Sequence, residues 1–216
     1  MNLLPKVSKV NMKIKLGSLY VIISIPLCCA MTAIILLDSS QTVILGCISA
    51  VLHESGHLIF MKLFDSFPKK IKISLFDIAI IDNKKYKRPL HQELLITLGG
   101  VMMNLIFGLI FFGLYLSLEY NFLLILAGTN ILLLIYNLLP VDTLDGGQAL
   151  YLILSSKLSE KSTERIMLIA SLIILLPCTI LGFLLLLQSK YNFTLLLTSL
   201  YLIAVILLKR SKIKQH

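Results

Sequence analysis

The chain has 216 residues, of which 57% are hydrophobic and 14% are charged, and its mean hydropathy is +0.92. Water-soluble domains of this length do not show that balance, so the composition predicts a protein that lies in a lipid bilayer. The formal net charge of +9 does not indicate nucleic-acid binding, because the lysines and arginines lie between apolar segments and are not interleaved with aromatic residues.

Six apolar segments approach the roughly 20 residues that are needed to cross a hydrocarbon core. They lie at about 17–37, 42–64, 94–117, 121–140, 166–187 and 193–208. None carries a signal-peptide cleavage pattern, so we expect the N-terminus to be retained. If the N-terminus is cytoplasmic, every lysine and arginine except Lys190 falls on the cytoplasmic side, as the positive-inside rule requires. The sequence therefore predicts an all-α polytopic membrane protein with about six transmembrane helices and both termini in the cytoplasm.

The connection at about 65–93, between the second and third predicted spans, is long enough to carry structure of its own. Its residues 71–81 are rich in β-branched side chains and are bounded by polar residues. This pattern predicts one or two short strands at the membrane surface, and an amphipathic surface segment is an equally good interpretation. We expect the connection to lie in the cytoplasm.

The second predicted span contains the sequence His53-Glu54-Ser55-Gly56-His57, which matches the pattern HExxH. Residues four apart lie on one face of a helix, so both imidazoles can reach one metal ion while Glu54 faces its water. Two histidines and a glutamate are costly within lipid unless they are paired or bound to metal. The pattern predicts a zinc site with Glu54 as catalytic base, and a polar cluster that bonds to neighbouring helices is the alternative.

A catalytic zinc ion takes three protein ligands and one open position, so a third ligand is needed. Asp145 and Asp142 both follow the fourth predicted span, where Pro140 ends the helix and two glycines allow a close approach of the backbone. Spacing favours Asp145 only modestly, because an Asp-Gly pair is also common in turns. The four cysteines lie in apolar runs without CxxC spacing and are expected to be reduced packing residues.

The combination of motifs resembles the site-2 protease family of intramembrane metalloproteases, peptidase family M50. That family joins HExxH in one span to N-x-x-P and L-D-G in a later one, and this chain has Asn137-Leu138-Leu139-Pro140 followed by Leu144-Asp145-Gly146. A glycine followed by a small or polar residue in the third span is matched by Gly100 and Asn104. The Gly-Pro pair that is usual there is Gly99-Gly100 in this chain.

The resemblance implies that Asp145 is the third zinc ligand, with one Zn²⁺ per chain, and that Asn137, Pro140, Gly100 and Asn104 contribute to substrate binding. A helix cap beside Pro140 is the alternative role for Asn137, and close helix packing is the alternative for Gly100 and Asn104. The family implies hydrolysis of a peptide bond in or near a transmembrane segment of a membrane-tethered protein substrate. The bacterial sporulation-type branch is the most similar one, which implies release of a transcription or signalling factor.

We therefore expect a single transmembrane metalloprotease domain over 1–216, with a catalytic core at about 42–150 and no separate soluble domain. The expected location is the bacterial cell membrane, with the lipid bilayer, a membrane regulatory partner or a second copy as neighbours and no nucleic acid. A membrane ion or metal transporter is the alternative function, because intramembrane histidines and acids also line ion paths. A substrate helix must unwind before it is cut, and a strand within 71–81 is a candidate to pair with the unwound stretch.

Overall fold

The computed structural model describes residues 11–16, 19–24, 32, 42–68, 70–73, 78–81, 88–188 and 194–213. Six of its helices have defined bounds: α2 (Thr42–Leu63), α3 (Leu90–Leu118), α4 (Asn121–Leu138), α5 (Asp145–Ser155), α6 (Glu160–Gln188) and α7 (Thr194–Ile213). In this part of the chain, four segments are long and apolar enough to cross a membrane: Thr42–Leu63, Gly99–Leu118, Asn121–Leu138 and Glu160–Leu184. They coincide with four of the six predicted spans, and α7 follows the course of the last one.

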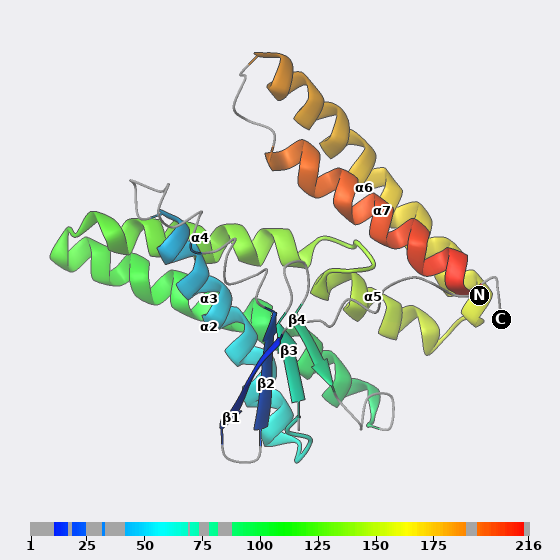
Figure 1. Ribbon diagram of the computed structural model, residues 1–216, viewed down its shortest axis with the longest axis horizontal. Helices are drawn as coiled ribbons and strands as arrows, with labels where there is room; N and C mark the ends of the chain where they lie inside the picture. Colours follow the sequence, from blue (N-terminus) through cyan, green and yellow to red (C-terminus); the bar gives the residue numbers. More distant parts are fainter. Residues whose placement is uncertain are drawn as a thin grey trace.

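The helices form two antiparallel hairpins (Figure 1). α3 and α4 make the first hairpin, and the turn between them begins at Glu119, whose left-handed φ of 57° ends α3. α2 packs against α3 where Gly56 meets Gly99, and a Cβ atom on Gly56 would overlap the backbone of Gly99. The absence of side chains at this crossing lets the backbones of α2 and α3 approach closely.

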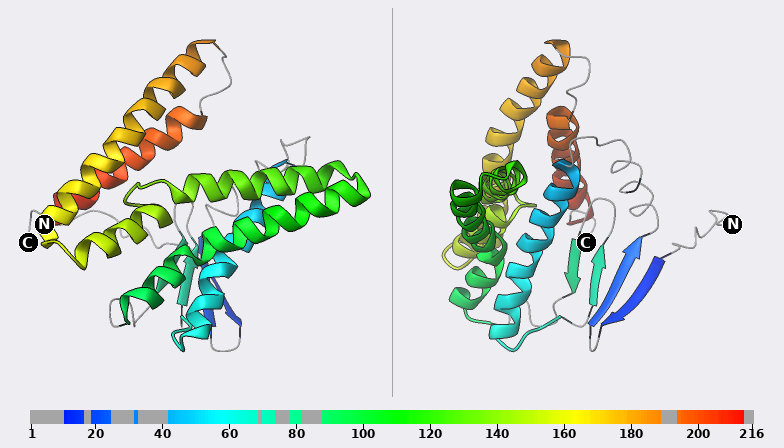
Figure 2. Two further views of the ribbon diagram at one scale, coloured as in Figure 1. Left: turned by 180° about the vertical axis from the view of Figure 1, so that it is seen from behind. Right: turned by 90° about the vertical axis from the view of Figure 1, so that its left-hand side faces the viewer.

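α6 and α7 make the second hairpin, which stands away from the first, and the short helix α5 lies between the two (Figures 1 and 2). The connection from α4 to α5 is anchored in a hydrophobic cluster that joins it to the second hairpin. The buried members of this cluster are Val141, Leu144, Leu175, Leu202 and Ile206. Burial of these side chains fixes the path of the chain just before α5 begins.

A four-stranded sheet lies beside the helices, in the order β1 (Asn11–Leu16), β2 (Leu19–Ser24), β3 (Lys70–Ile73) and β4 (Ile78–Ile81). β1 and β2 are antiparallel, β2 and β3 are parallel, and β3 and β4 are antiparallel. One or two short strands are predicted within residues 71–81. The structure has β3 and β4 there, with β3 beginning one residue earlier, at Lys70.

The sheet corrects the expectation of an all-α fold and of a helical first span at 17–37. Residues 19–24 of that predicted span form β2, which pairs with β1 on one side and with β3 on the other. Hydropathy cannot distinguish an apolar strand from the start of a membrane helix, because the pairing partners decide between them. The rest of that predicted span, apart from residue 32, lies outside the described residues.

Candidate metal site

α2 places His53 and His57 one helical turn apart on the face that packs against α3. Their side chains are buried, with 6% and 9% of the residue surface exposed. Gly100 of α3 lies directly over both rings, and a Cβ atom built on it would come within 2.6 Å of Nε2 of each imidazole. The glycine therefore leaves open the space into which the two ring nitrogens point.

The first turn of α5 carries Asp145 to the same place. α4 ends at Leu138, and Leu139 has an extended conformation, as expected for a residue that precedes proline. Gly146 and Gly147 then bring the first turn of α5 against the carbonyl groups of Leu138 and Val141, so close that a Cβ on either would overlap them. The broken connection thus folds back on itself and aims the Asp145 side chain at α2.

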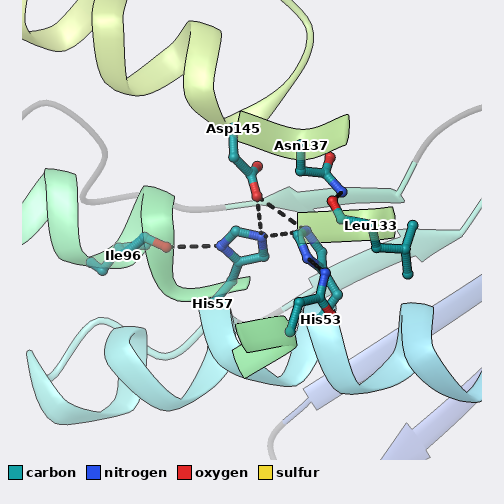
Figure 3. A network of polar contacts seen from close by, with 7 residues as sticks. His53, His57, Ile96, Leu133, Asn137 and Asp145 are labelled. Carbon is teal, nitrogen blue, oxygen red and sulfur yellow. Dashed lines mark hydrogen bonds and ion pairs between the residues drawn. The ribbon is translucent and has the colours of Figure 1, made fainter. Parts of the chain in front are cut away.

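Three ligand atoms converge in this arrangement (Figure 3). Oδ2 of Asp145 lies 3.1 Å from Nε2 of His53 and 3.3 Å from Nε2 of His57. The two Nε2 atoms lie 3.4 Å from each other. Asp142, the competing acid, is instead fixed by its backbone N–H, which donates to Oγ of Ser171 at 3.0 Å.

These distances suit a metal ion. Tetrahedral zinc with bonds of about 2.0–2.1 Å separates its nitrogen and oxygen ligands by about 3.3–3.4 Å. Among the described residues, the buried Oδ2 of Asp145 has no hydrogen-bond partner of acceptable geometry, although two imidazoles face it. His53, His57 and Asp145 form the group that could hold a metal in this part of the chain. Two histidines and one carboxylate match the ligand set of catalytic zinc sites that keep a fourth position open.

The ring nitrogens that face away from this centre also have partners. Nδ1 of His57 lies 2.8 Å from the carbonyl oxygen of Ile96, and Nδ1 of His53 lies 2.9 Å from the side-chain amide of Asn104. Such contacts fix the rotation of an imidazole about its bond to the chain. The Ile96 carbonyl could not be predicted from sequence, because every residue type carries this group.

Electrostatics favour a charged carboxylate at position 145. Burial raises the pKa of the Asp145 carboxyl, but its contacts and charge interactions with His53 and His57 lower that pKa by more, so it lies below its ordinary value. Asp145 is also the first residue of α5, where the unpaired N–H groups and the helix dipole stabilise negative charge.

The remaining predicted site residues lie on α2, α3, α4 and the α4–α5 connection. Glu54 is half-buried on α2 next to His53. Asn137 is half-buried at the end of α4, and its Nδ2 donates to the carbonyl oxygen of Leu133 at 3.0 Å. Pro140 lies in the α4–α5 connection, whereas Gly100 and Asn104 both contact the histidine rings.

Comparison with known proteins agrees with these features. The model of the peptidase family M50 matches residues 116–178, which include the Leu144-Asp145-Gly146 sequence. A zinc metalloprotease of Methanocaldococcus jannaschii is 30% identical over 126 residues, and the match covers 55% of this chain but 36% of that relative. The chain thus spans about a third of the length of this curated relative.

A site-2 protease from Methanocaldococcus jannaschii has a similar fold, with a TM-score of 0.60 and 24% sequence identity. The likeness covers 89% of this chain and 91% of the solved one. The resemblance that the motifs predicted is confirmed by the family model and by the sequence relative. The chain is accordingly similar to the M50 peptidases over residues 116–178, and its fold is similar to that of a site-2 protease.

Proposed function

We propose that the chain is an intramembrane zinc metalloprotease that hydrolyses a peptide bond in or near a transmembrane segment of a membrane-tethered substrate. The observation that carries the proposal is the convergence of His53, His57 and Asp145, with ligand atoms 3.1–3.4 Å apart. The family resemblance and the four helices long enough to span a membrane support the same reaction and its setting.

His53, His57 and Asp145 are the residues that would hold the ion. Zinc in such a site supplies a water of lowered pKa and a polarised scissile carbonyl. Glu54 accepts the proton of the attacking water and delivers it to the leaving amine, which is the general acid–base role of this carboxylate. We assign Asn137 and Pro140, which precede Asp145 in the chain, to binding of the substrate backbone, with residues 42–150 as the catalytic core.

The β4 edge of the sheet is the proposed docking place for an unwound substrate. β4 stands at one end of the strand order, so among the described strands it pairs with β3 alone. An extended peptide can add to such an edge through backbone hydrogen bonds. We expect single prolines placed along Ile78–Ile81 to slow cleavage at the positions whose N–H faces the edge, measured on a single-span substrate in lipid vesicles. Equal cleavage at every position would reject this docking place.

The biological role that we propose is regulated intramembrane proteolysis, in which cleavage releases a transcription or signalling factor from the membrane. A protease with several membrane-spanning helices shares the bilayer with membrane-tethered substrates. The similarity to the bacterial sporulation-type branch remains a prediction, as does the cytoplasmic position of both termini.

The decisive experiment compares the wild type with Glu54→Gln and with Glu160→Gln, in which the same change is made at an exposed residue in the first turn of α6. The purified full chains are placed in vesicles with a single-span substrate, and cleavage and bound zinc are both measured. We expect Glu54→Gln to keep its zinc and to lose at least about 100-fold in rate, as removal of a general base does. The control should cleave at the wild-type rate. Cleavage by Glu54→Gln at the wild-type rate would reject the assigned base.

A further inference from the structure

We propose that Asn104 is a positioning residue whose amide oxygen holds the His53 imidazole in the tautomer that presents Nε2 to the metal. Asn104 lies on α3, its side chain is completely buried, and the structure places its Nδ2, which exchanges with Oδ1 by a half-turn of the amide, 2.9 Å from Nδ1 of His53. The inference rests on the metal site of the proposed function and adds a residue that acts through one of its ligands.

The chemistry of imidazole determines which amide atom must face the ring. A neutral imidazole carries one proton, and the nitrogen that binds a metal is the unprotonated one. Nε2 of His53 is the atom that converges with His57 and Asp145, so the proton belongs on Nδ1. The partner of Nδ1 must then be an acceptor, which in Asn104 is Oδ1.

The amide of Asn104 can supply this acceptor without any movement of the backbone. A half-turn about the last side-chain bond exchanges Oδ1 and Nδ2, which are nearly equal in size. Among the described residues, Oδ1 is the amide atom that is buried without a hydrogen-bond partner. The exchange places Oδ1 against Nδ1–H and moves Nδ2 into the unpaired position, so the number of unpaired atoms is unchanged. The gain is a hydrogen bond to a ligand imidazole, which orients the ring and increases its basicity.

His57 provides an internal comparison. Its Nδ1 faces the backbone carbonyl of Ile96 at 2.8 Å, and a carbonyl can only accept. His57 is therefore held as the Nδ1–H tautomer by a fixed backbone group. The hydrogen-bond partner of Nδ1 in His53 is a side chain, so the tautomer of His53 can be altered by substitution.

The test measures zinc affinity by chelator competition on the full chain in detergent, together with ¹⁵N NMR of histidine side chains in the zinc-loaded protein. Asn104→Leu removes the acceptor and is expected to lower zinc affinity about 10–100-fold, the usual cost of losing such a partner. Asn104→Asp supplies only acceptor atoms and is expected to bind zinc at least as tightly as the wild type. The NMR spectrum of the wild type should show His53 protonated at Nδ1.

Asn130→Leu is the matched control, because Asn130 is equally buried on α4. Its amide donates to Oγ of Ser49 and to the carbonyl oxygen of Leu126. In the described part of the chain, neither of these hydrogen bonds involves a histidine. Its zinc affinity should equal that of the wild type.

The possible outcomes separate the role of Asn104 from the site itself. Absence of zinc binding by the wild type overturns both the site and this inference. Zinc binding that Asn104→Leu and Asn130→Leu leave equally strong, or weaken equally, overturns only the role of Asn104. If Asn104→Leu does not fold, two other results still overturn the role of Asn104. One is a wild-type NMR spectrum in which Nδ1 of His53 is unprotonated. The other is zinc binding by Asn104→Asp that is much weaker than that of the wild type.

Discussion

At the scale of single residues, the metal centre depends on the absence of a side chain as much as on the ligands. His53 and His57 can turn Nε2 toward Asp145 because Gly100 leaves the space above both rings empty. A methyl group at this position would meet both Nε2 atoms at 2.6 Å, well inside van der Waals contact. The structure therefore gives Gly100 of the family pattern a steric role at the metal centre.

We predict that Gly100→Ala lowers zinc affinity, because the imidazole rings must rotate or α3 must shift to make room for the methyl group. Loss of a hydrogen-bond partner of a ligand lowers metal affinity roughly 10–100-fold, and we expect an effect at least as large here. The measurement is chelator competition on the purified chain. Gly113→Ala on the same helix is the control, since a Cβ there meets nothing within 4 Å. It should leave zinc affinity unchanged and stabilise the helix by about 0.5–1 kcal/mol. Equal zinc affinity in the two variants would contradict the steric role of Gly100.

At the scale of elements, the third ligand lies in the first turn of α5, and the connection that precedes this helix sets its position. Val141 and Leu144 bury this connection against α6 and α7, and Ser171 of α6 accepts a hydrogen bond from the backbone of Asp142. Ser171 is itself completely buried and donates to the carbonyl of Met167. The second hairpin therefore helps to set the position of Asp145, although it supplies no ligand among the described residues.

Removal of the Ser171 hydroxyl should loosen the connection. Loss of a hydrogen bond of this kind lowers the free energy of unfolding by about 1 kcal/mol, and by more where the N–H group remains buried and unpaired. We expect Ser171→Ala to weaken zinc binding severalfold and to slow cleavage in proportion. Ser199→Ala is the matched control, because the Ser199 hydroxyl is also buried but bonds to the carbonyl of Leu196 in its own helix. If both variants bind zinc equally well, the hydrogen bond to Asp142 does not position the ligand.

At the scale of the whole molecule, a bound ion would join parts of the chain that are far apart in sequence. Two of its ligands come from α2 and the third from α5, which follows the α3–α4 hairpin in the chain. A ligand that binds only the folded state stabilises it in proportion to the logarithm of its concentration. Bound zinc should therefore link α2 to α5, the helix that precedes the second hairpin in the chain.

We expect zinc at a hundred times its dissociation constant to stabilise the folded protein by about 2.7 kcal/mol. The measurement is the melting temperature in detergent, with and without a chelator. Asp145→Ala should lose most of this response, whereas Asp142→Asn should keep it, because the backbone and not the carboxylate of Asp142 makes the contact with Ser171. A zinc response that survives in Asp145→Ala would show that the ion binds elsewhere.

The sequence alone determined the membrane setting, four of the helical spans and the pair of histidines on one helix face. These features follow from local composition and from the 3.6-residue period of a helix, which need no knowledge of distant contacts. Spacing favoured Asp145 over Asp142 only modestly, because both follow Pro140 closely and only the fold-back of the connection decides which carboxylate faces α2.

The tertiary structure alone decided the fate of residues 19–24 and the partners of the two imidazoles. An apolar run becomes a strand when neighbouring strands are available to pair with it, and β1 and β3 provide them. The contacts of His57 with the Ile96 carbonyl and of His53 with Asn104 join residues 39 and 51 positions apart. Such contacts arise only when helices cross at a particular place and angle, which the local sequence of either helix does not specify.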